Sequence, residues 1–258
     1  MAAGQAAAAT LEDAGPIWPE IVNGEGRSPV LLICEHASKH IPARFGDLGL
    51  SEDARSSHAI WDPGAYEVAR GLSQRLDAPL IAARVSRVLF DCNRQPEAPD
   101  AIPETCEVYR FAGNQGLSAE ARKERTSSIY LPFRDTISKT IRGSDRVRAI
   151  VTVHSFTPVF FGAPREVEIG IIHDSDRRLA DSMLALSPEV TDLKVARNEP
   201  YGPEHGVTHT LKEHGQKNGL LNVMLEIRSD LIGTPQEQSM VSSMVARWIE
   251  LALGRQAK

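Results

Sequence analysis

The sequence predicts a single-domain α/β protein with a mostly parallel, mixed central sheet and helices on both faces of that sheet. Short apolar runs alternate with segments of helical periodicity along most of the 258-residue chain, and this alternation is typical of βαβ units. No internal repeat and no linker divides the sequence. We therefore expect residues 29–258 to form one domain, preceded by a flexible tail and lead-in at residues 1–28.

The predicted strands are short apolar runs. Residues 30–34 (VLLIC) form a continuous run, as expected of a strand that is buried on both faces. The other predicted strands are residues 79–84, 87–91, 148–153, 167–172 and 220–227. Each run has the length of an ordinary strand, and we expect them to share one sheet.

The predicted helices follow these strands. They comprise residues 63–76, 118–141, 176–187, 207–214 and 235–253, of which the last has the clearest helical period. Asp62 is a good N-cap for the first helix, with Pro63 at the first helical position. Pro132 is expected to kink the second helix, since it lacks the N–H that a helix interior requires.

Composition narrows the class of protein. The net charge is −5 and the basic residues are scattered, so we expect no nucleic-acid partner. Cys34, Cys92 and Cys106 form no CxxC pair, which indicates free thiols in a reducing compartment. No apolar stretch approaches the about 18 residues of a membrane span, and the N-terminus lacks the pattern of a secretory signal. We therefore expect a cytoplasmic protein with no membrane partner.

Polar side chains gather at the carboxyl ends of the predicted strands. In open α/β sheets, functional sites form in the crevice beyond those ends. The strand-end residues are His36, then Asp91, Asn93 and Arg94, then His154 and Ser155, and finally Glu226 and Arg228. Two imidazoles, two carboxylates and a guanidinium at one sheet edge are a more specific signal than a single polar residue.

This set of residues suits metal-assisted hydrolysis. A catalytic zinc site uses three protein ligands, commonly imidazole and carboxylate, together with water. We expect His36 and His154 to be two ligands of one divalent ion, preferably zinc, and Asp62 to be the third. Two alternatives remain open, because Asp62 could instead serve as a helix N-cap and Glu35 could be the third ligand. Glu226 is the expected general base.

Asn93 and Arg94 are expected to bind the carboxylate of a substrate. A guanidinium offers a planar fork that grips a carboxylate through two parallel hydrogen bonds. The alternative is that Arg94 forms an ordinary surface ion pair.

Seven segments of the chain resemble the N-formylglutamate amidohydrolase family. They are ICEHAS (33–38), HAIWDPGA (58–65), RVLFDCNRQP (87–96), TVHSF (152–156), NEPYG (198–202), GVTHTLKEHG (206–215) and LEIRSD (225–230). The resemblance covers about residues 29–253. It implies that the chain converts N-formylglutamate to formate and glutamate, a reaction on a small-molecule substrate.

Three of these segments also look like the zinc carboxypeptidase superfamily, to which the first family is distantly related in fold. That resemblance implies a zinc-carboxypeptidase-like fold and assigns His154 to metal, Asn93 and Arg94 to carboxylate recognition, and Glu226 to the base. One position departs from the pattern. The carboxypeptidases have a glutamate three residues after their first histidine ligand, where this chain has Lys39.

The polar segment at residues 198–215 supplies further candidates. The resemblance makes Asn198, Tyr201 and His209 pocket residues that contact the substrate or its developing oxyanion, and we expect Arg228 to contact substrate as well. His205 and His214 fit equally well as exposed residues of a surface helix. The remaining histidines, His40, His58 and His173, are expected to be structural.

The leading hypothesis is therefore a metal-dependent amidohydrolase of N-acyl amino acids, acting best on N-formylglutamate. The alternatives are a related N-acyl amino acid deacylase, a small peptidase, or a binding protein of the same fold that has lost catalysis. A serine hydrolase using Ser38 or Ser155 is disfavoured, because the chain has no GxSxG elbow. Nucleotide use is disfavoured too, because neither GxGxxG nor a P-loop motif occurs.

Overall fold

The computed structural model describes residues 15–256, and its centre is a seven-stranded sheet of order β1-β3-β2-β6-β11-β9-β10. The strands are β1 (Glu20–Val22), β2 (Val30–Cys34), β3 (Leu80–Ala82), β6 (Ala149–Phe156), β9 (Ile169–Ile172), β10 (Val195–Arg197) and β11 (Leu221–Arg228). Strands β3, β2, β6 and β11 are mutually parallel. The β1–β3 and β11–β9 pairs are antiparallel. The prediction of an α/β fold with a mixed, mostly parallel sheet is confirmed.

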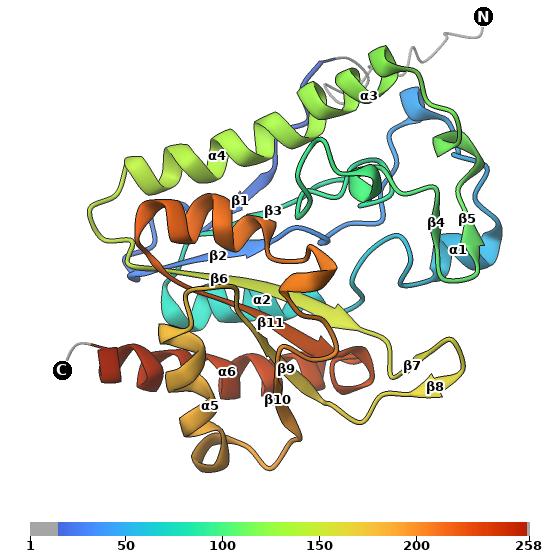
Figure 1. Cartoon of the computed structure of the whole chain (residues 1–258). Coiled ribbons are helices and arrows are strands. Elements are labelled where there is room, and N and C mark those ends of the chain that lie inside the picture. The colour runs from blue at the N-terminus through green and yellow to red at the C-terminus, as the bar shows by residue number, and fades with distance from the viewer. Residues whose placement is uncertain (1–14, 257–258) are drawn as a thin grey trace, which may run out of the picture.

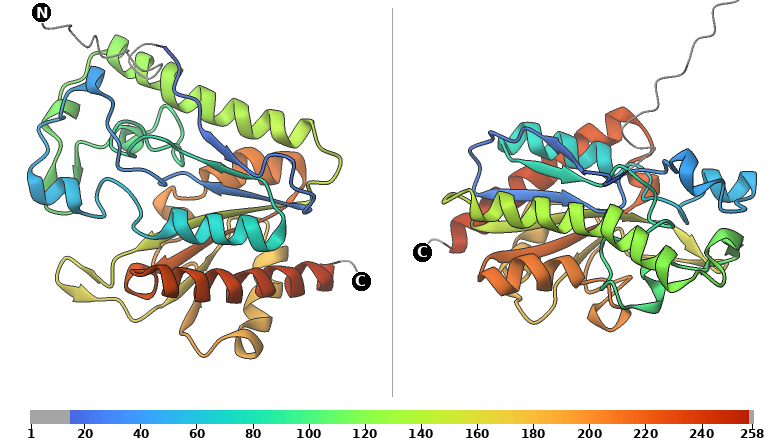
Figure 2. Two further views of the ribbon diagram at one scale, coloured as in Figure 1. Left: turned by 180° about the vertical axis from the view of Figure 1, so that it is seen from behind. Right: turned by 90° about the horizontal axis from the view of Figure 1, so that it is seen from above.

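Helices cover both faces of the sheet (Figures 1 and 2). The helices are α1 (Glu52–Ser56), α2 (Ala65–Leu76), α3 (Ala119–Arg125), α4 (Leu131–Arg142), α5 (Arg178–Val190) and α6 (Pro235–Gln256). Helices α2, α5 and α6 lie on one face, whereas α4 and the helical turns at residues 209–218 lie on the other. No helix within residues 15–256 combines the length and apolarity needed to cross a membrane.

The alternation of side chains along β2 divides the apolar core into two layers. Leu32 and Cys34 pack into the layer under α2, α5 and α6, whereas Leu31 and Ile33 pack into the layer on the opposite face. This is the two-residue period of a strand, and all five residues of β2 are buried. Trp248 of α6 fills the first layer and donates a hydrogen bond to the carbonyl of Met183 at 2.8 Å. The central strands that position the sheet edge are therefore packed on both faces.

Two short hairpins stand at the edge where β6 and β11 end (Figure 1). The first joins β4 (Thr105–Cys106) to β5 (Tyr109–Arg110), and the second joins β7 (Val159–Phe160) to β8 (Ala163–Pro164). The backbone N–H of Phe161 in the second hairpin donates to Glu107 in the first at 2.8 Å. The two hairpins therefore contact each other beside the carboxyl ends of the central strands.

One predicted strand is not found, and one strand lies in the segment predicted as a lead-in. Residues 87–91 form a turn instead of a strand, because the N–H of Leu89 bonds to the carbonyl of Ser86 at 3.0 Å and no neighbouring strand pairs with the segment. Its apolar side chains are buried all the same, and a buried turn has the same composition as a buried strand. At the start of the chain, residues 20–22 of the predicted lead-in form edge strand β1. The rest of the predicted tail, residues 1–14, lies outside the described residues.

The long helix predicted at 118–141 is built in three parts. Ser118 caps it as expected, since its side chain accepts from the N–H of Ala121 at 3.2 Å. Helix α3 then passes into a π-helical turn at Thr126–Tyr130, which leads into α4. Pro132 stands at the start of α4. Because proline cannot donate to the carbonyl four residues earlier and its ring crowds that carbonyl, the wider turn accommodates it where a kink was predicted.

The start of α2 also differs from the prediction. Gly64, with φ 78°, occupies the N-cap position, so Asp62 and Pro63 precede the helix. A Cβ at residue 64 would lie 2.5 Å from the carbonyl oxygen of Ile232, so both the backbone angle and the close approach require glycine. The prediction that Asp62 caps this helix is wrong, and its carboxylate is left for another role.

Candidate active site

Three polar residues converge at the carboxyl ends of the central strands. His36 follows β2, His154 lies in β6, and Glu226 lies directly beside His154 in the parallel register of β6 and β11. All three are buried. Parallel strands deliver their carboxyl ends to one edge of a sheet, so residues distant in the chain become neighbours here.

Three ligand atoms from His36, Asp62 and His154 face one another. The Nδ1 atoms of the two histidines are 3.1 Å apart. The Oδ2 atom of Asp62 lies 2.8 Å from Nδ1 of His154 and 3.2 Å from Nδ1 of His36. The backbone holds Asp62 in this position, because its N–H bonds to the carbonyl of His36 at 3.0 Å. These three residues could hold a metal ion.

The second nitrogen of each imidazole faces a buried carboxylate. Nε2 of His36 lies 2.7 Å from Oδ1 of Asp91, and Nε2 of His154 lies 3.1 Å from Oε2 of Glu35. A carboxylate accepts a hydrogen bond from an N–H that faces it, so the other nitrogen of that neutral ring is the one with a lone pair. Both Nδ1 atoms are therefore expected to present lone pairs to the centre.

The spacing of these three atoms is compatible with a tetrahedral metal site. Ligand atoms at zinc bond lengths in a tetrahedral site are about 3.3–3.5 Å apart, close to the separations of 2.8–3.2 Å found between these three atoms. Two imidazoles and one carboxylate leave the fourth position to water. The carboxylates behind the histidines complete the arrangement that orients metal-binding imidazoles in other proteins.

The charged groups of this centre favour an ionised Asp62 and a positive charge, either a proton or a metal ion, at His154. Burial raises the pKa of Asp62, but the two neighbouring histidines outweigh it and hold that pKa well below its usual range. Burial lowers the pKa of His154, yet Glu35 and Asp62 on either side raise it well above its usual value when no cation lies between them. A proton and a metal ion therefore compete for the same lone pair.

Two residues had left the identity of the third ligand open: Glu35 was the alternative ligand, and Lys39 stands where the carboxypeptidases have a glutamate. Both lie away from the three ligand atoms of His36, Asp62 and His154. Glu35 faces the far nitrogen of His154. Lys39 is exposed, and its Nζ lies 5.5 Å from the centroid of the Trp61 ring. The departure from the carboxypeptidase pattern therefore falls outside this cluster, and the carboxylate that faces the two Nδ1 atoms is that of Asp62.

Glu226 is an acid suited to proton transfer. Burial raises its pKa to about 7, and within residues 15–256 its Oε2 atom has no hydrogen-bond partner. A carboxyl group with a pKa near neutrality can both accept and return a proton at that pH. Its position beside His154 puts it next to the candidate metal centre.

A pocket of about 450 Å³ opens onto these residues. His36, Asp62, His154 and Glu226 line it, together with His58, Arg87, Asn93, Arg94, Cys106, Ser155, Phe156, Thr157, Phe160, Arg165, Pro200, Tyr201, His205 and Val207. This volume lies within the range of small-molecule sites. A larger groove of about 810 Å³ next to Trp18 and Lys139 has no histidine in its lining, so the smaller pocket is the candidate active site.

The residues predicted for substrate binding divide into two groups. Asn93, Arg94 and Tyr201 line the pocket. The lining of the pocket does not include Asn198, His209 or Arg228. Oδ1 of Asn198 accepts from the N–H of His173 at 2.9 Å, and Nε2 of His209 lies 2.8 Å from the hydroxyl of Tyr130. The guanidinium of Arg228 binds Asp230 at 2.8 Å.

Asn93 and Arg94 already have protein partners. The Asn93 amide donates to the carbonyl of Val207 at 2.6 Å and accepts from the N–H of Thr210 at 3.0 Å. Nε of Arg94 donates to Asp100 at 2.7 Å. Asn93 thus anchors the segment after residue 206 to the pocket, while Arg94 retains only part of its guanidinium for a ligand.

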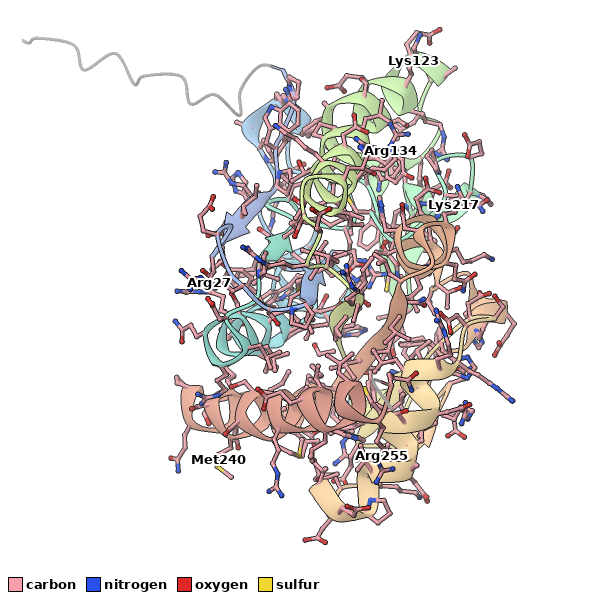
Figure 3. All side chains as sticks on the ribbon, turned by 90° about the vertical axis from the view of Figure 1, so that its left-hand side faces the viewer. Arg27, Lys123, Arg134, Lys217, Met240 and Arg255 are labelled. Atoms are coloured by element: carbon pink, nitrogen blue, oxygen red, sulfur yellow. The ribbon has the colours of Figure 1, made fainter. Side chains whose placement is uncertain are left out.

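Two pocket arginines were not singled out from the sequence. Arg87 donates to Oδ2 of Asp91 at 2.7 Å and lies 3.5 Å from Oδ1 of Asp62, so it ties together the carboxylates around His36. The sequence feature that could have identified Arg87 is its position four residues before Asp91. Arg165 directly follows β8, and no motif marked it. Basic side chains elsewhere, such as Arg27, Lys123 and Arg255, are spread over separate elements (Figure 3).

Comparisons with known proteins agree with this description. Residues 28–233 match the N-formylglutamate amidohydrolase family. A structure of a gene product from Agrobacterium tumefaciens is 48% identical, covers 96% of this chain and 99% of its own, and superposes with a TM-score of 0.92. An N-formylglutamate amidohydrolase from Ralstonia eutropha JMP134 is 19% identical, with 91% and 99% coverage and a TM-score of 0.56. No curated protein matches the sequence significantly.

The structural likeness to the Ralstonia eutropha protein extends over nearly the whole fold but, at 19% identity, concerns the fold alone. The predicted α/β architecture with a mixed central sheet is confirmed at this level. The family match covers most of the residues that build the pocket, from β2 through β11. It includes His36, Asp62, His154 and Glu226. This chain therefore belongs to the N-formylglutamate amidohydrolase family.

Proposed function

We propose that this protein is a metal-dependent amidohydrolase that cleaves small N-acyl amino acids, with N-formylglutamate as its substrate and formate and glutamate as its products. The observation that carries the proposal is the pair of Nδ1 atoms of His36 and His154, which face each other at 3.1 Å with Asp62 beside them. Family membership supports an amide as the bond that is cleaved. The three residues would hold one divalent ion, preferably zinc.

Glu226 is the proposed proton carrier. A divalent ion bound by the three ligands would act as a Lewis acid toward the acyl carbonyl and make the attacking water more acidic. Glu226 in its deprotonated form accepts a proton from that water as the oxygen adds to the carbonyl carbon. It then gives the proton to the leaving amine as the C–N bond breaks, which releases formate and the free amino acid. Its burial next to His154 supports this role.

The substrate carboxylate is proposed to bind at Arg94. Nε and Nη1 of this residue are engaged by Asp100 and by the carbonyls of Asn93 and Gly206, whereas no such bond involves Nη2 within residues 15–256. The hydroxyl of Tyr201 is a further candidate contact, since it lines the same pocket. Asn198, His209 and Arg228 are proposed to support the walls of the pocket from outside its lining.

We place this reaction in the cytoplasm. Cys34 and Cys92 are buried free thiols, and Cys106 is a free, partly buried thiol, which supports a reducing compartment. The proposed partner is the small-molecule substrate alone.

The test combines a metal assay with a turnover screen. Protein purified without added metal, and again after zinc supplementation, is analysed for bound metal. It is then incubated with N-formyl, N-acetyl and N-succinyl derivatives of glutamate and other amino acids. We expect about one zinc per chain and the highest turnover with N-formylglutamate. A chain that binds no metal after supplementation, or that hydrolyses none of these amides, contradicts the proposal and supports a binding protein instead.

A further inference from the structure

Among residues 15–256, Arg165 is the pocket arginine whose guanidinium pairs with no carboxylate. Its Nη2 donates to the hydroxyl of Tyr201 at 3.0 Å, and its Nη1 lies 3.5 Å from the carbonyl of Thr157. No ion pair links it to a carboxylate among residues 15–256. It is partly buried and lines the pocket together with Glu226.

The other two arginines of the pocket differ in this respect. Arg87 pairs with Asp91 at 2.7 Å, and Arg94 pairs with Asp100 at 2.7 Å. A partly buried positive charge without a counter-ion is unfavourable, because it loses hydration without gaining an opposite charge. A carboxylate on a ligand in this pocket would supply the opposite charge that Arg165 lacks.

Aromatic rings hold the guanidinium of Arg165 in place. Its Cζ atom lies 4.4 Å from the ring centroid of Phe160, 5.0 Å from that of Tyr201 and 5.5 Å from that of Phe156. Ring faces attract cations and exclude water. These contacts fix the side chain before a ligand binds, so that less conformational entropy is lost on binding.

We infer that Arg165 is the specificity-determining residue for the side-chain carboxylate of a dicarboxylic N-acyl amino acid. This inference rests on the proposed function. Arg94 and Arg165 belong to different segments of the pocket wall, and a substrate with two carboxylates engages both guanidiniums. A substrate with an amide in place of the second carboxylate leaves Arg165 without its counter-ion. The pocket thereby selects the glutamate type of substrate over the glutamine type.

The experiment compares two substrates that differ only at this group. The kcat/KM values for N-formylglutamate and N-formylglutamine are measured for the wild type and for Arg165→Gln, Arg165→Lys and Arg177→Gln. Arg177 is the matched control, because its side chain is 72% exposed and pairs with Asp181 on the surface of α5. Equilibrium binding of the products L-glutamate and L-glutamine is measured by calorimetry for the same four proteins, which requires no turnover.

For Arg165→Gln we expect kcat/KM for N-formylglutamate to fall by about 10- to 100-fold, mainly through a higher KM. A loss of this size corresponds to the usual contribution of hydrogen bonds to a charged group. The value for N-formylglutamine should change little, so the preference between the two substrates is lost. Arg165→Lys should keep part of the preference through its charge, and Arg177→Gln should keep all of it.

The outcomes separate this inference from the proposed function. If Arg165→Gln lowers kcat/KM for both substrates and the affinity for both products by the same factor, the residue is structural and the inference is wrong. Hydrolysis by the wild type still stands in that case. If the wild type hydrolyses neither amide but binds L-glutamate more tightly than L-glutamine in a manner that depends on Arg165, the inference stands and the catalytic proposal is wrong. If the wild type shows no preference in either assay, the inference is wrong.

Discussion

The Nδ1 atoms of His36 and His154 lie 3.1 Å apart, although each imidazole turns its other nitrogen toward a buried carboxylate. Two lone pairs can approach so closely only when a proton or a metal ion lies between them. The Asp62 carboxylate adds a third acceptor at 2.8 Å from Nδ1 of His154. The centre thus collects electron-pair donors around one point, and this is what a divalent ion requires.

Replacement of His154 tests the ligand set directly. We expect His154→Ala to lose bound metal and activity, because one of three ligands is absent, while the sheet remains folded. Metal content and circular dichroism are measured on the variant and on His40→Ala, in which an exposed histidine is removed. Retention of metal and turnover in His154→Ala would refute the assignment.

Replacement of Glu226 separates proton transfer from metal binding. Glu226→Gln keeps the size and burial of the side chain but cannot accept a proton. We expect normal metal content and a loss of about 10²- to 10⁴-fold in kcat, the usual contribution of a general base. Steady-state kinetics and metal analysis check this. A variant with wild-type kcat shows that another group moves the proton.

The raised pKa of Glu226 predicts a pH dependence of stability in the metal-stripped protein. Burial raises the pKa of its carboxyl group from 4.5 to about 7, so the folded state holds this proton more tightly than the unfolded state. The stabilisation is complete below the unfolded pKa and is lost as the pH rises through about 7.

We therefore expect the free energy of unfolding of the wild type to decrease between about pH 5 and 8 relative to Glu226→Gln, which has no such proton. Urea denaturation at several pH values, with a chelator present throughout, gives this difference. Parallel pH profiles for the two proteins would show that the carboxyl group of Glu226 titrates as an ordinary exposed acid.

Replacement of Glu35 tests the role of the carboxylate that faces the second nitrogen of His154. It faces Nε2 of His154 at 3.1 Å and is fully buried. Glu35→Gln keeps the shape but weakens the acceptor that orients the imidazole, and we expect metal affinity to fall by about 10- to 100-fold. Competition with a chromogenic chelator measures it, with the exposed Glu25→Gln as the control. Equal affinities in the two variants would mean that Glu35 does not orient the ligand.

Much of the site could be predicted from the sequence because parallel strands follow a general rule. Short apolar runs indicate buried strands, and their carboxyl ends meet at one edge. His36, His154 and Glu226 follow or end such runs, so their convergence was expected. The same reasoning predicted the mixed sheet and the long helix α6.

Local patterns could not decide the roles of residues in turns. Asp62 had the spacing of an N-cap, but the left-handed Gly64 takes that position and leaves the carboxylate to face His36 and His154. Residues 87–91 had the composition of a strand, yet their neighbours in the fold leave no partner for pairing.

The sequence by itself determined the fold class, the sheet edge that carries the chemistry, and the two histidines and the acid that meet there. Tertiary structure alone decided that the Asp62 carboxylate lies beside the two histidines, that Asn93 and Arg94 are partly used within the protein, and that Arg165 lines the pocket without pairing to a carboxylate among residues 15–256. The physical reason is that apolar periodicity is a local property of the chain. The direction of a loop side chain depends instead on contacts with residues distant in the sequence, which no local pattern records.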